Sequence, residues 1–202
     1  MTRTKIKSTK PWWESKSKFL LQEYANKYEA TFVEASFKNW KYTGRHVLIR
    51  LPHGRGQMYL TVTDSNSNGS NTNSGQVIGI KYKYKPRRKL EYLLSSVKSP
   101  LLLILHGNLR QVTLPNPLSK SFHAGASHPS MLRAILKHEG IADLLEEHKG
   151  ARLKARVKEH EALLTFSETN KKADVVFLRG CVQIMVSFVE AMYEQGIVRE
   201  GK

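Results

Sequence analysis

The chain has few of the residues that build redox, metal and acid–base sites. Among its 202 residues there is one cysteine, Cys181, and only three are aspartate. A single cysteine excludes an intramolecular disulfide and a metal cage made of cysteines. The shortage of paired carboxylates removes the simplest arrangement for general acid–base chemistry. We therefore expect a protein that is not an enzyme and that holds no cofactor and no metal.

Long apolar runs are also scarce. The run LLLIL (101–105) is far shorter than the ~20 apolar residues that a membrane-spanning helix needs. The stretch 175–192 is longer, but its interior contains Arg179, Gln183 and Glu190, whose side chains are costly in lipid. The basic N-terminus is not followed by the apolar segment of a secretory signal. These absences predict a soluble, cytoplasmic protein.

Positive charge is abundant and unevenly placed. The chain has 33 Lys and Arg against 17 acidic residues, which gives a net charge of +16. Residues 1–100 have a net charge of +13 and residues 101–202 only +3. A coat of charge that served only solubility would be spread more evenly, so this division indicates an anionic partner. The apolar fraction, 40%, is enough for a buried core and excludes disorder of the whole chain.

The hydrophobic pattern predicts an α+β fold: antiparallel β-hairpins with interspersed helices and a long apolar C-terminal helix. We expect a flexible basic arm at 1–15 and a single domain at 16–202, with possible lobes at 16–114 and 115–202. The predicted strands are 45–51, 57–63, 76–85, a hairpin around Gly107-Asn108, and a hairpin over 151–167. The predicted helices are 16–29, 87–98, a segment from Pro129 to Gly140, 141–148, and 175–195, and a polar loop is expected at 64–75.

The segment 121–168 contains SFHAGASHPSMLRAIL, a short predicted helix, and the strand pair RLKARV and ALLTF. This order of elements resembles an uncharacterised bacterial domain of unknown function. The resemblance covers about a quarter of the chain and includes no diagnostic motif. It implies a similar local fold and carries over no activity.

Four groups of residues have the side chains of a reactive or anion-binding site. Cys181 lies within the apolar final helix, so we expect a buried thiol with no reactivity. The eight histidines include no H-x-x-x-H pair, and we expect His123 and His128 to lie in a loop around Gly125. His160, between two glutamates, fits a polar hairpin turn. The sequence HGRG (53–56) offers backbone N–H groups and a guanidinium to an anion, although a tight turn explains it more simply.

Two cationic strand faces carry the functional prediction. In 76–85 the lysines alternate with apolar residues, and in 151–159 basic residues again occupy alternate positions. Repeated Lys and Arg supply the sequence-independent part of nucleic-acid binding. If both strands belong to one sheet, their basic faces form a continuous surface for nucleic-acid backbone, with little sequence selectivity. The predicted nucleic-acid-binding residues are Lys81, Lys83, Lys85, Arg87, Arg88, Lys89, Arg152, Lys154, Arg156 and Lys158.

Other interpretations remain open at this stage. Trp12 and Trp13 lie among lysines, an arrangement that suits a peripheral interaction module or an anionic membrane surface. The final helix suits either a core position or a homodimer interface. An enzyme of unrecognised type would have to use the histidine groups. The sequence does not distinguish RNA, DNA and lipid as the partner.

Overall fold

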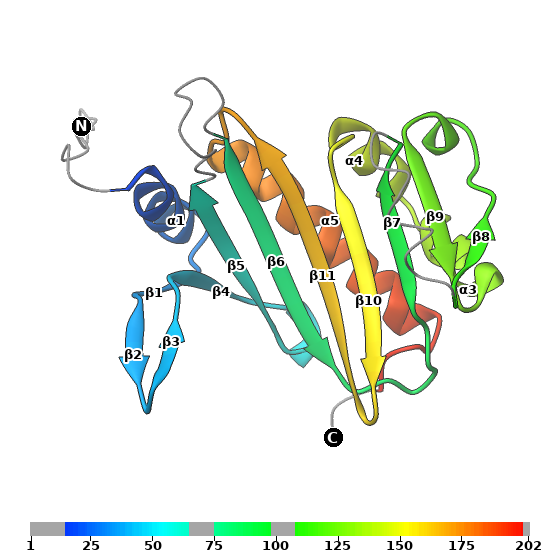
Figure 1. The fold of residues 1–202 in the computed structure, drawn as a ribbon, viewed down its shortest axis with the longest axis horizontal. Helices are drawn as coiled ribbons and strands as arrows, with labels where there is room; N and C mark the ends of the chain where they lie inside the picture. The colour runs from blue at the N-terminus through cyan, green and yellow to red at the C-terminus, as the bar shows by residue number, and fades with distance from the viewer. Residues whose placement is uncertain (1–14, 65–74, 98–107, 200–202) are drawn as a thin grey trace.

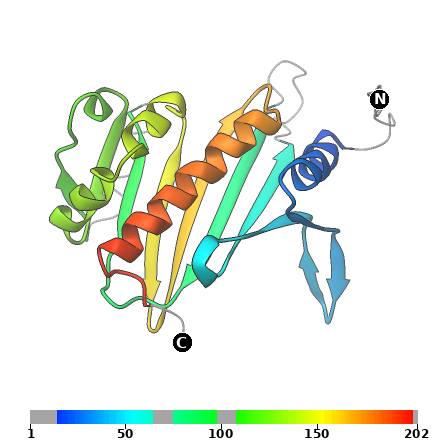
Figure 2. The same ribbon diagram turned by 180° about the vertical axis from the view of Figure 1, so that it is seen from behind.

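The computed structural model describes residues 15–64, 75–97 and 108–199, and it has the predicted α+β architecture. A nine-stranded antiparallel sheet has the order β1-β4-β5-β6-β11-β10-β7-β9-β8, and a separate two-stranded sheet is formed by β2 and β3. The long helix α5 crosses one face of the large sheet (Figures 1 and 2). The strands and helices are bounded as follows: α1 Lys16–Lys27, β1 Thr31–Val33, β2 Ser36–Lys38, β3 Lys41–Thr43, β4 His46–Arg50, η1 Pro52–Gly54, β5 Gln57–Asp64, β6 Gln76–Tyr84, β7 Tyr92–Ser96, β8 Arg110–Val112, η2 Leu118–Lys120, β9 Phe122–Ala126, α3 Pro129–Leu136, α4 Ile141–Glu147, β10 Arg152–Lys158, β11 Glu161–Asn170 and α5 Val175–Glu194.

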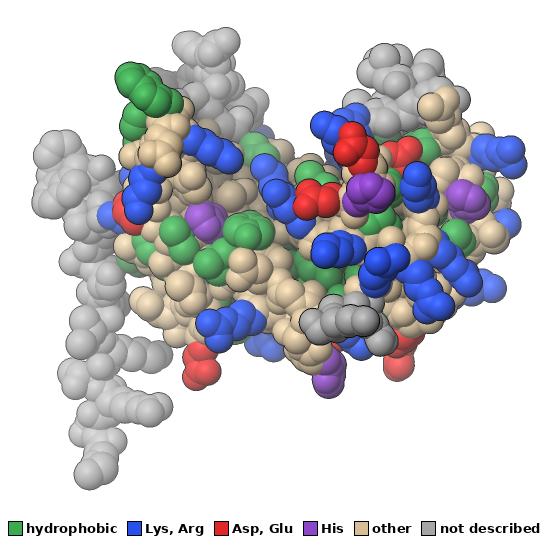
Figure 3. All heavy atoms as spheres, turned by 90° about the horizontal axis from the view of Figure 1, so that it is seen from below, with side chains coloured by type: hydrophobic (Ala, Val, Ile, Leu, Met, Phe, Trp, Pro, Cys, Tyr) green, Lys and Arg blue, Asp and Glu red, His purple; other side chains and the backbone are tan. Residues whose placement is uncertain are grey.

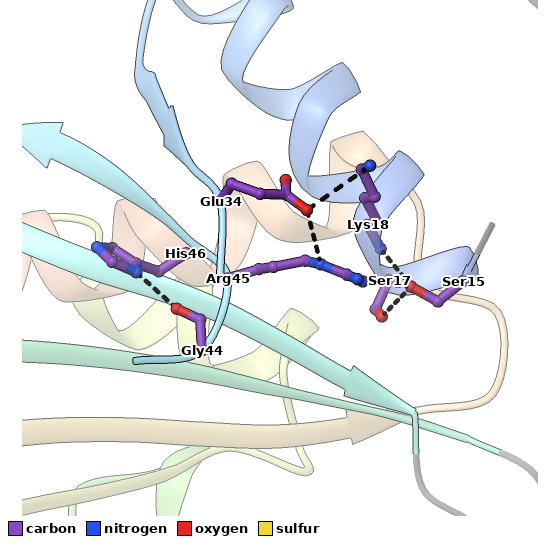
Figure 4. Close-up of polar contacts among 7 residues, drawn as sticks. All are labelled: Ser15, Ser17, Lys18, Glu34, Gly44, Arg45 and His46. Carbon is purple, nitrogen blue, oxygen red and sulfur yellow. Dashed lines mark hydrogen bonds and ion pairs between the residues drawn. The ribbon is translucent and has the colours of Figure 1, made fainter. Parts of the chain in front are cut away.

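The first helix, α1, is fixed to the sheet by a small polar network (Figure 4). Ser15 is the N-cap, and its hydroxyl accepts a hydrogen bond from the backbone N–H of Lys18 at 3.2 Å. The same hydroxyl accepts a bond of 3.0 Å from Arg45, which precedes β4. Glu34 forms ion pairs with Lys18 and Arg45. The contacts orient α1 so that Leu20, Leu21, Tyr24 and Ala25 are buried.

The centre of the sheet is built from strands that are distant in sequence. The predicted hairpin β4–β5 is confirmed, and β6 extends it. The second predicted hairpin, β10–β11, is also confirmed, and it lies between β6 and β7. The sheet therefore contains strands from both of the ranges considered as lobes, 16–114 and 115–202.

Helix α5 provides most of the second layer. Asp174 caps it, accepting a hydrogen bond of 2.7 Å from the backbone N–H of Phe177. By length and composition alone α5 is long and apolar enough to cross a membrane, but the core helix of a globular domain has the same properties. Here the sheet of the same chain covers its apolar side. Its buried residues are Val175, Leu178, Cys181, Val182, Ile184, Met185, Phe188, Val189, Ala191 and Met192.

The structure corrects the predicted helix at 87–98. That segment contains strand β7, and its first four residues, Tyr92–Ser95, are buried. A central strand buried on both faces has a continuous apolar run, and the leucines of this run happen to match helical spacing. The expected helix start, Pro86, instead forms a bridge with Val198.

Two further predictions concern the neighbouring strands β8 and β9. The hairpin at Gly107-Asn108 lies partly outside the described residues, and β8 pairs with β9. The expected loop around Gly125 is wrong, because Gly125 belongs to strand β9. Most of the polar loop predicted at 64–75 and most of the basic arm predicted at 1–15 lie outside the described residues. Of the described positions in those ranges, Asp64 ends β5 and Ser15 caps α1.

Candidate nucleic-acid interface

The two cationic strands lie on the same face of one sheet. Strand β11 separates them, and the register aligns Lys81 with Thr165 and Thr165 with Lys154. The next row aligns Lys83 with Leu163 and Leu163 with Arg156. Side chains that share a row in neighbouring strands point to the same face of the sheet. We call Lys81, Lys83, Arg152, Lys154, Arg156 and Lys158 the cationic sheet face.

The spacing of the cationic sheet face follows from β geometry. Alternate residues along a strand are ~6.6–7 Å apart, and strands on either side of β11 are about 9.6 Å apart. In β6 the residues of the opposite face, including Ile80, Tyr82 and Tyr84, are buried, as predicted. Helix α5 lies on that opposite side (Figures 1 and 2). No described helix covers the cationic side of β6, β11 and β10.

The charges of this face act on one another. The pKa of Lys154 is lowered, first by desolvation and then by the positive charges of Arg156 and Arg152, while Glu91 acts in the opposite direction. Glu91 also accepts a hydrogen bond of 3.1 Å from the backbone N–H of Val157. The lowered pKa of Lys154 is the expected effect of partial burial, to which the nearby cations add.

Carboxylates neutralise little of this charge. Within the described residues, no ion pair is formed by Lys81, Lys83, Arg152, Arg156 or Lys158. Glu161 is the cross-strand neighbour of Lys158, so the field is weakest at the hairpin end. By contrast, Lys18 and Arg45, near the β1–β4 end of the sheet, both form ion pairs with Glu34 (Figure 4).

The remaining predicted residues lie at the end of the sheet rather than on its face. Lys85 directly follows β6, and its carbonyl accepts a hydrogen bond of 2.9 Å from Arg199. The backbone N–H groups of Arg87 and Arg88 donate to Ile197, and the side chains from Arg87 to Lys89 are exposed. Seen from below, Lys and Arg side chains gather at this end of the molecule (Figure 3). Arg199 is a member of this group that the sequence analysis missed, because only the fold brings it to β6.

One aromatic side chain accompanies the cations. Tyr59 of β5 is the cross-strand neighbour of Lys81, and it is half-buried. Its ring lies 5.7 Å from that of His46. The sequence analysis gave Tyr59 no role in base stacking, whereas the structure places it beside the cationic sheet face.

The described structure places the two predicted histidine groups in separate elements. His123 lies in β9 and His128 precedes α3, at different ends of an extended segment. Glu159 and His160 form the turn between β10 and β11. Three pockets formed by described residues, of about 650, 200 and 690 Å³, have no histidine in their linings.

A buried polar cluster, which the sequence analysis missed, joins α4, β11 and α5. His148 donates a hydrogen bond of 2.7 Å from Nδ1 to Glu168. The Cys181 sulfur lies 3.8 Å from that nitrogen and 3.9 Å from the carboxylate oxygen. The sequence does contain one sign of this cluster: Glu168 continues the alternation of Leu164 and Phe166, which indicates a carboxylate on the buried face of the strand.

The geometry of this cluster differs from that of a zinc site. Among the described residues it is the one group of His, Cys and carboxylate side chains close enough to share an ion. Two tetrahedral zinc ligands at ~2.0–2.1 Å from the metal are about 3.4 Å apart. The 2.7 Å between His148 and Glu168 is instead a hydrogen-bond distance. Burial and the Glu168 charge also raise the pKa of the Cys181 thiol. We therefore describe it as a buried hydrogen-bonded cluster.

No known protein family model matches this chain, and neither curated proteins nor solved structures show a significant match to it. The resemblance of residues 121–168 to a bacterial domain therefore rests on its sequence pattern alone.

Proposed function

We propose that the chain is a binding protein for a polyanion, with nucleic-acid backbone as the favoured ligand. The observation that supports this most is the register across β6, β11 and β10, which aligns two rows of cations on one sheet face. A sheet face without a covering helix is accessible to an extended polymer. The half-buried ring of Tyr59 beside Lys81 favours a ligand with bases or sugars to stack over a simple polyphosphate.

Binding to single-stranded RNA or DNA, measured by fluorescence anisotropy over a range of salt concentrations, tests this proposal. Each phosphate contact contributes about −0.7 to the slope of log K against log salt. Replacing Lys81, Lys83 and Arg156 by Gln should weaken binding and make the slope less steep by about 2. The effect should be similar for different base sequences, because backbone contacts carry no sequence information.

A charge-matched control separates this face from the overall charge. Arg133, Lys137 and Lys149 are exposed and lie in or beside α3 and α4, away from the cationic sheet face. Replacing all three by Gln removes the same charge and should leave the slope nearly unchanged. Equal losses in the two triple variants, or no binding by the unaltered chain at low salt, would refute the proposal.

A second candidate, binding to an anionic membrane surface, is favoured by the β2–β3 hairpin. This hairpin projects from the body of the molecule (Figures 1 and 2). Phe37, Trp40 and Tyr42 are 63%, 94% and 69% exposed. Trp40 has φ 59°, a strained conformation for a large side chain. Lys38 and Lys41 flank the turn, and aromatic rings combined with lysines suit the interface of an anionic bilayer. Trp12 and Trp13, which first suggested this role, lie outside the described residues.

Co-sedimentation with anionic and with zwitterionic vesicles tests the membrane candidate. Phe37→Ser combined with Trp40→Ser should reduce binding to anionic vesicles. Val176→Ser is a suitable control, because Val176 is 65% exposed on α5, away from the hairpin. Unchanged binding by the double variant, or equal binding to both vesicle types, would exclude the hairpin as an anionic-membrane anchor.

A further inference from the structure

A pocket of about 690 Å³ opens at the lower end of β6. Four of its lining side chains are cationic: Arg55, Lys83, Lys85 and Arg199. Its lining includes no Asp or Glu. Carboxylates lie nearby: Glu91 acts on Tyr84 and accepts a hydrogen bond from the backbone of Val157, and Glu161 precedes Ala162, the cross-strand neighbour of Tyr84. The lining itself is positive, and the pocket has the volume of a small-molecule site.

Arg55 is held in place before any ligand binds. Its guanidinium carbon lies 4.8 Å from the centre of the Tyr193 ring. The Tyr82 hydroxyl donates a hydrogen bond of 2.8 Å to the Arg55 carbonyl. Gly56, with φ +95°, lets the HGRG turn adopt this path. A guanidinium stacked on a ring keeps its N–H edge available, and that edge matches two phosphate oxygens.

The pocket also has an aromatic surface. The rings of Tyr82 and Tyr84 are 5.7 Å apart and nearly parallel, with 12° between their planes. Tyr82, Tyr84 and Tyr193 all contribute to the lining. Tyr82 and Tyr84 are only 2% and 6% exposed, so the half-buried Tyr193 is the lining ring that can contact a base or a ribose. Inorganic phosphate would leave most of such a pocket unfilled.

We infer that this pocket binds a nucleoside phosphate monoester, and that the monoester is the end of the strand bound along the cationic sheet face. The inference rests on the proposed function. Lys83 supplies the link, because it lines the pocket while its side chain belongs to the cationic sheet face, on the other side of β6 from Tyr82 and Tyr84. A terminal monoester carries a charge of about −1.5 to −2, more than an internal phosphate diester. The four cations should therefore prefer the end of a strand to its middle.

The experiment compares oligonucleotides of one sequence with a 5′-phosphate, a 3′-phosphate or no terminal phosphate. We expect one phosphorylated form to bind about tenfold more tightly than the unphosphorylated form, a factor typical of one charge-assisted contact. Arg55→Gln combined with Arg199→Gln should abolish that preference, so that all three oligonucleotides bind with equal affinity. Arg133→Gln combined with Lys137→Gln is the charge-matched control, which should retain the preference.

Failure of this inference differs from failure of the proposed function. Equal binding of all three oligonucleotides refutes the pocket and leaves the cationic sheet face in place. Lys81→Gln combined with Arg156→Gln should weaken all three oligonucleotides by the same factor, and no effect would instead refute the sheet face. A free nucleoside 5′-monophosphate that binds through Arg55, without any end preference among oligonucleotides, would overturn the strand-end assignment.

Discussion

Replacing Gly180 by Ala should destabilise this protein, although the same change stabilises most helices. In a helix interior, Ala is favoured over Gly by about 0.8–1 kcal/mol. Here a Cβ at position 180 would lie 2.3 Å from Nε2 of His148 and 3.1 Å from its Cε1. Ordinary contacts between such atoms are about 3.5 Å or longer. The added methyl group therefore overlaps the imidazole ring.

His148 cannot move away without loss. Its Nδ1 bonds to Glu168 at 2.7 Å, and its ring centre lies 4.8 Å from that of Phe177. Overpacking costs about 1–3 kcal/mol, and a disrupted buried hydrogen bond costs a similar amount. After the gain in helix propensity, the free energy of unfolding should fall by about 1–5 kcal/mol.

Urea denaturation followed by circular dichroism measures this change, and a double-mutant cycle identifies its cause. In a His148→Ala background the obstruction is gone, so Gly180→Ala should stabilise by about 0.5–1 kcal/mol. The sign of the substitution should thus reverse. Our interpretation of the cluster would be refuted if Gly180→Ala were as stable as the unaltered chain, or if its effect were the same in both backgrounds.

Three further predictions concern capping, charge and alkaline pH. Asp174→Ala should lower the free energy of unfolding by about 1 kcal/mol, measured by urea denaturation, because the N-cap bond to Phe177 is lost; an unchanged midpoint would contradict this. Arg156→Gln should raise the pKa of Lys154, measured by NMR of the lysine ammonium, since Arg156 is one cause of its depression; a fall would contradict it. Burial raises the pKa of Tyr24 to about 12 from 10.0. Tyr24 therefore ionises at a lower pH in the unfolded state than in the folded state. The stability that buried Tyr24 contributes should be complete below pH 10 and be lost as the pH rises towards 12. Tyr24→Phe should make the alkaline loss of stability smaller, and an unchanged pH profile would contradict this.

Local periodicity was sufficient to predict the longer helices and strands, but not the short strands β1, β2 and β3. The alternation of Lys81 and Lys83 with buried tyrosines in β6, and the apolar spacing of α5, match the structure. The period of two residues in a strand, or 3.6 in a helix, is visible wherever one face of the element is buried and the other is exposed to solvent. Strand β7 lacks that contrast because both of its faces are covered. Strand β9 is rich in Ala and Gly, whose small side chains give little strand signal.

The candidate site was predictable in its parts and not in its assembly. Each cationic strand is visible in the sequence, but their alignment depends on β11 lying between β6 and β10. That order is set by long-range pairing, which the sequence pattern does not encode in any local segment. The same holds for the pocket at the lower end of β6, because only the fold brings Arg55 and Arg199 into one lining. His148, Glu168 and Cys181 likewise come from three separate elements.

The insertion of β10–β11 between β6 and β7 has a consequence for synthesis on the ribosome. When residues up to 97 have emerged, β6 still lacks the neighbour that completes its hydrogen bonding, and β7 has neither of its partners. Both strands keep open edges until residue 170 has left the exit tunnel, and open edges promote aggregation. A nascent chain that stalls before that point should depend on chaperones, whereas one released after α5 can close the layer by itself.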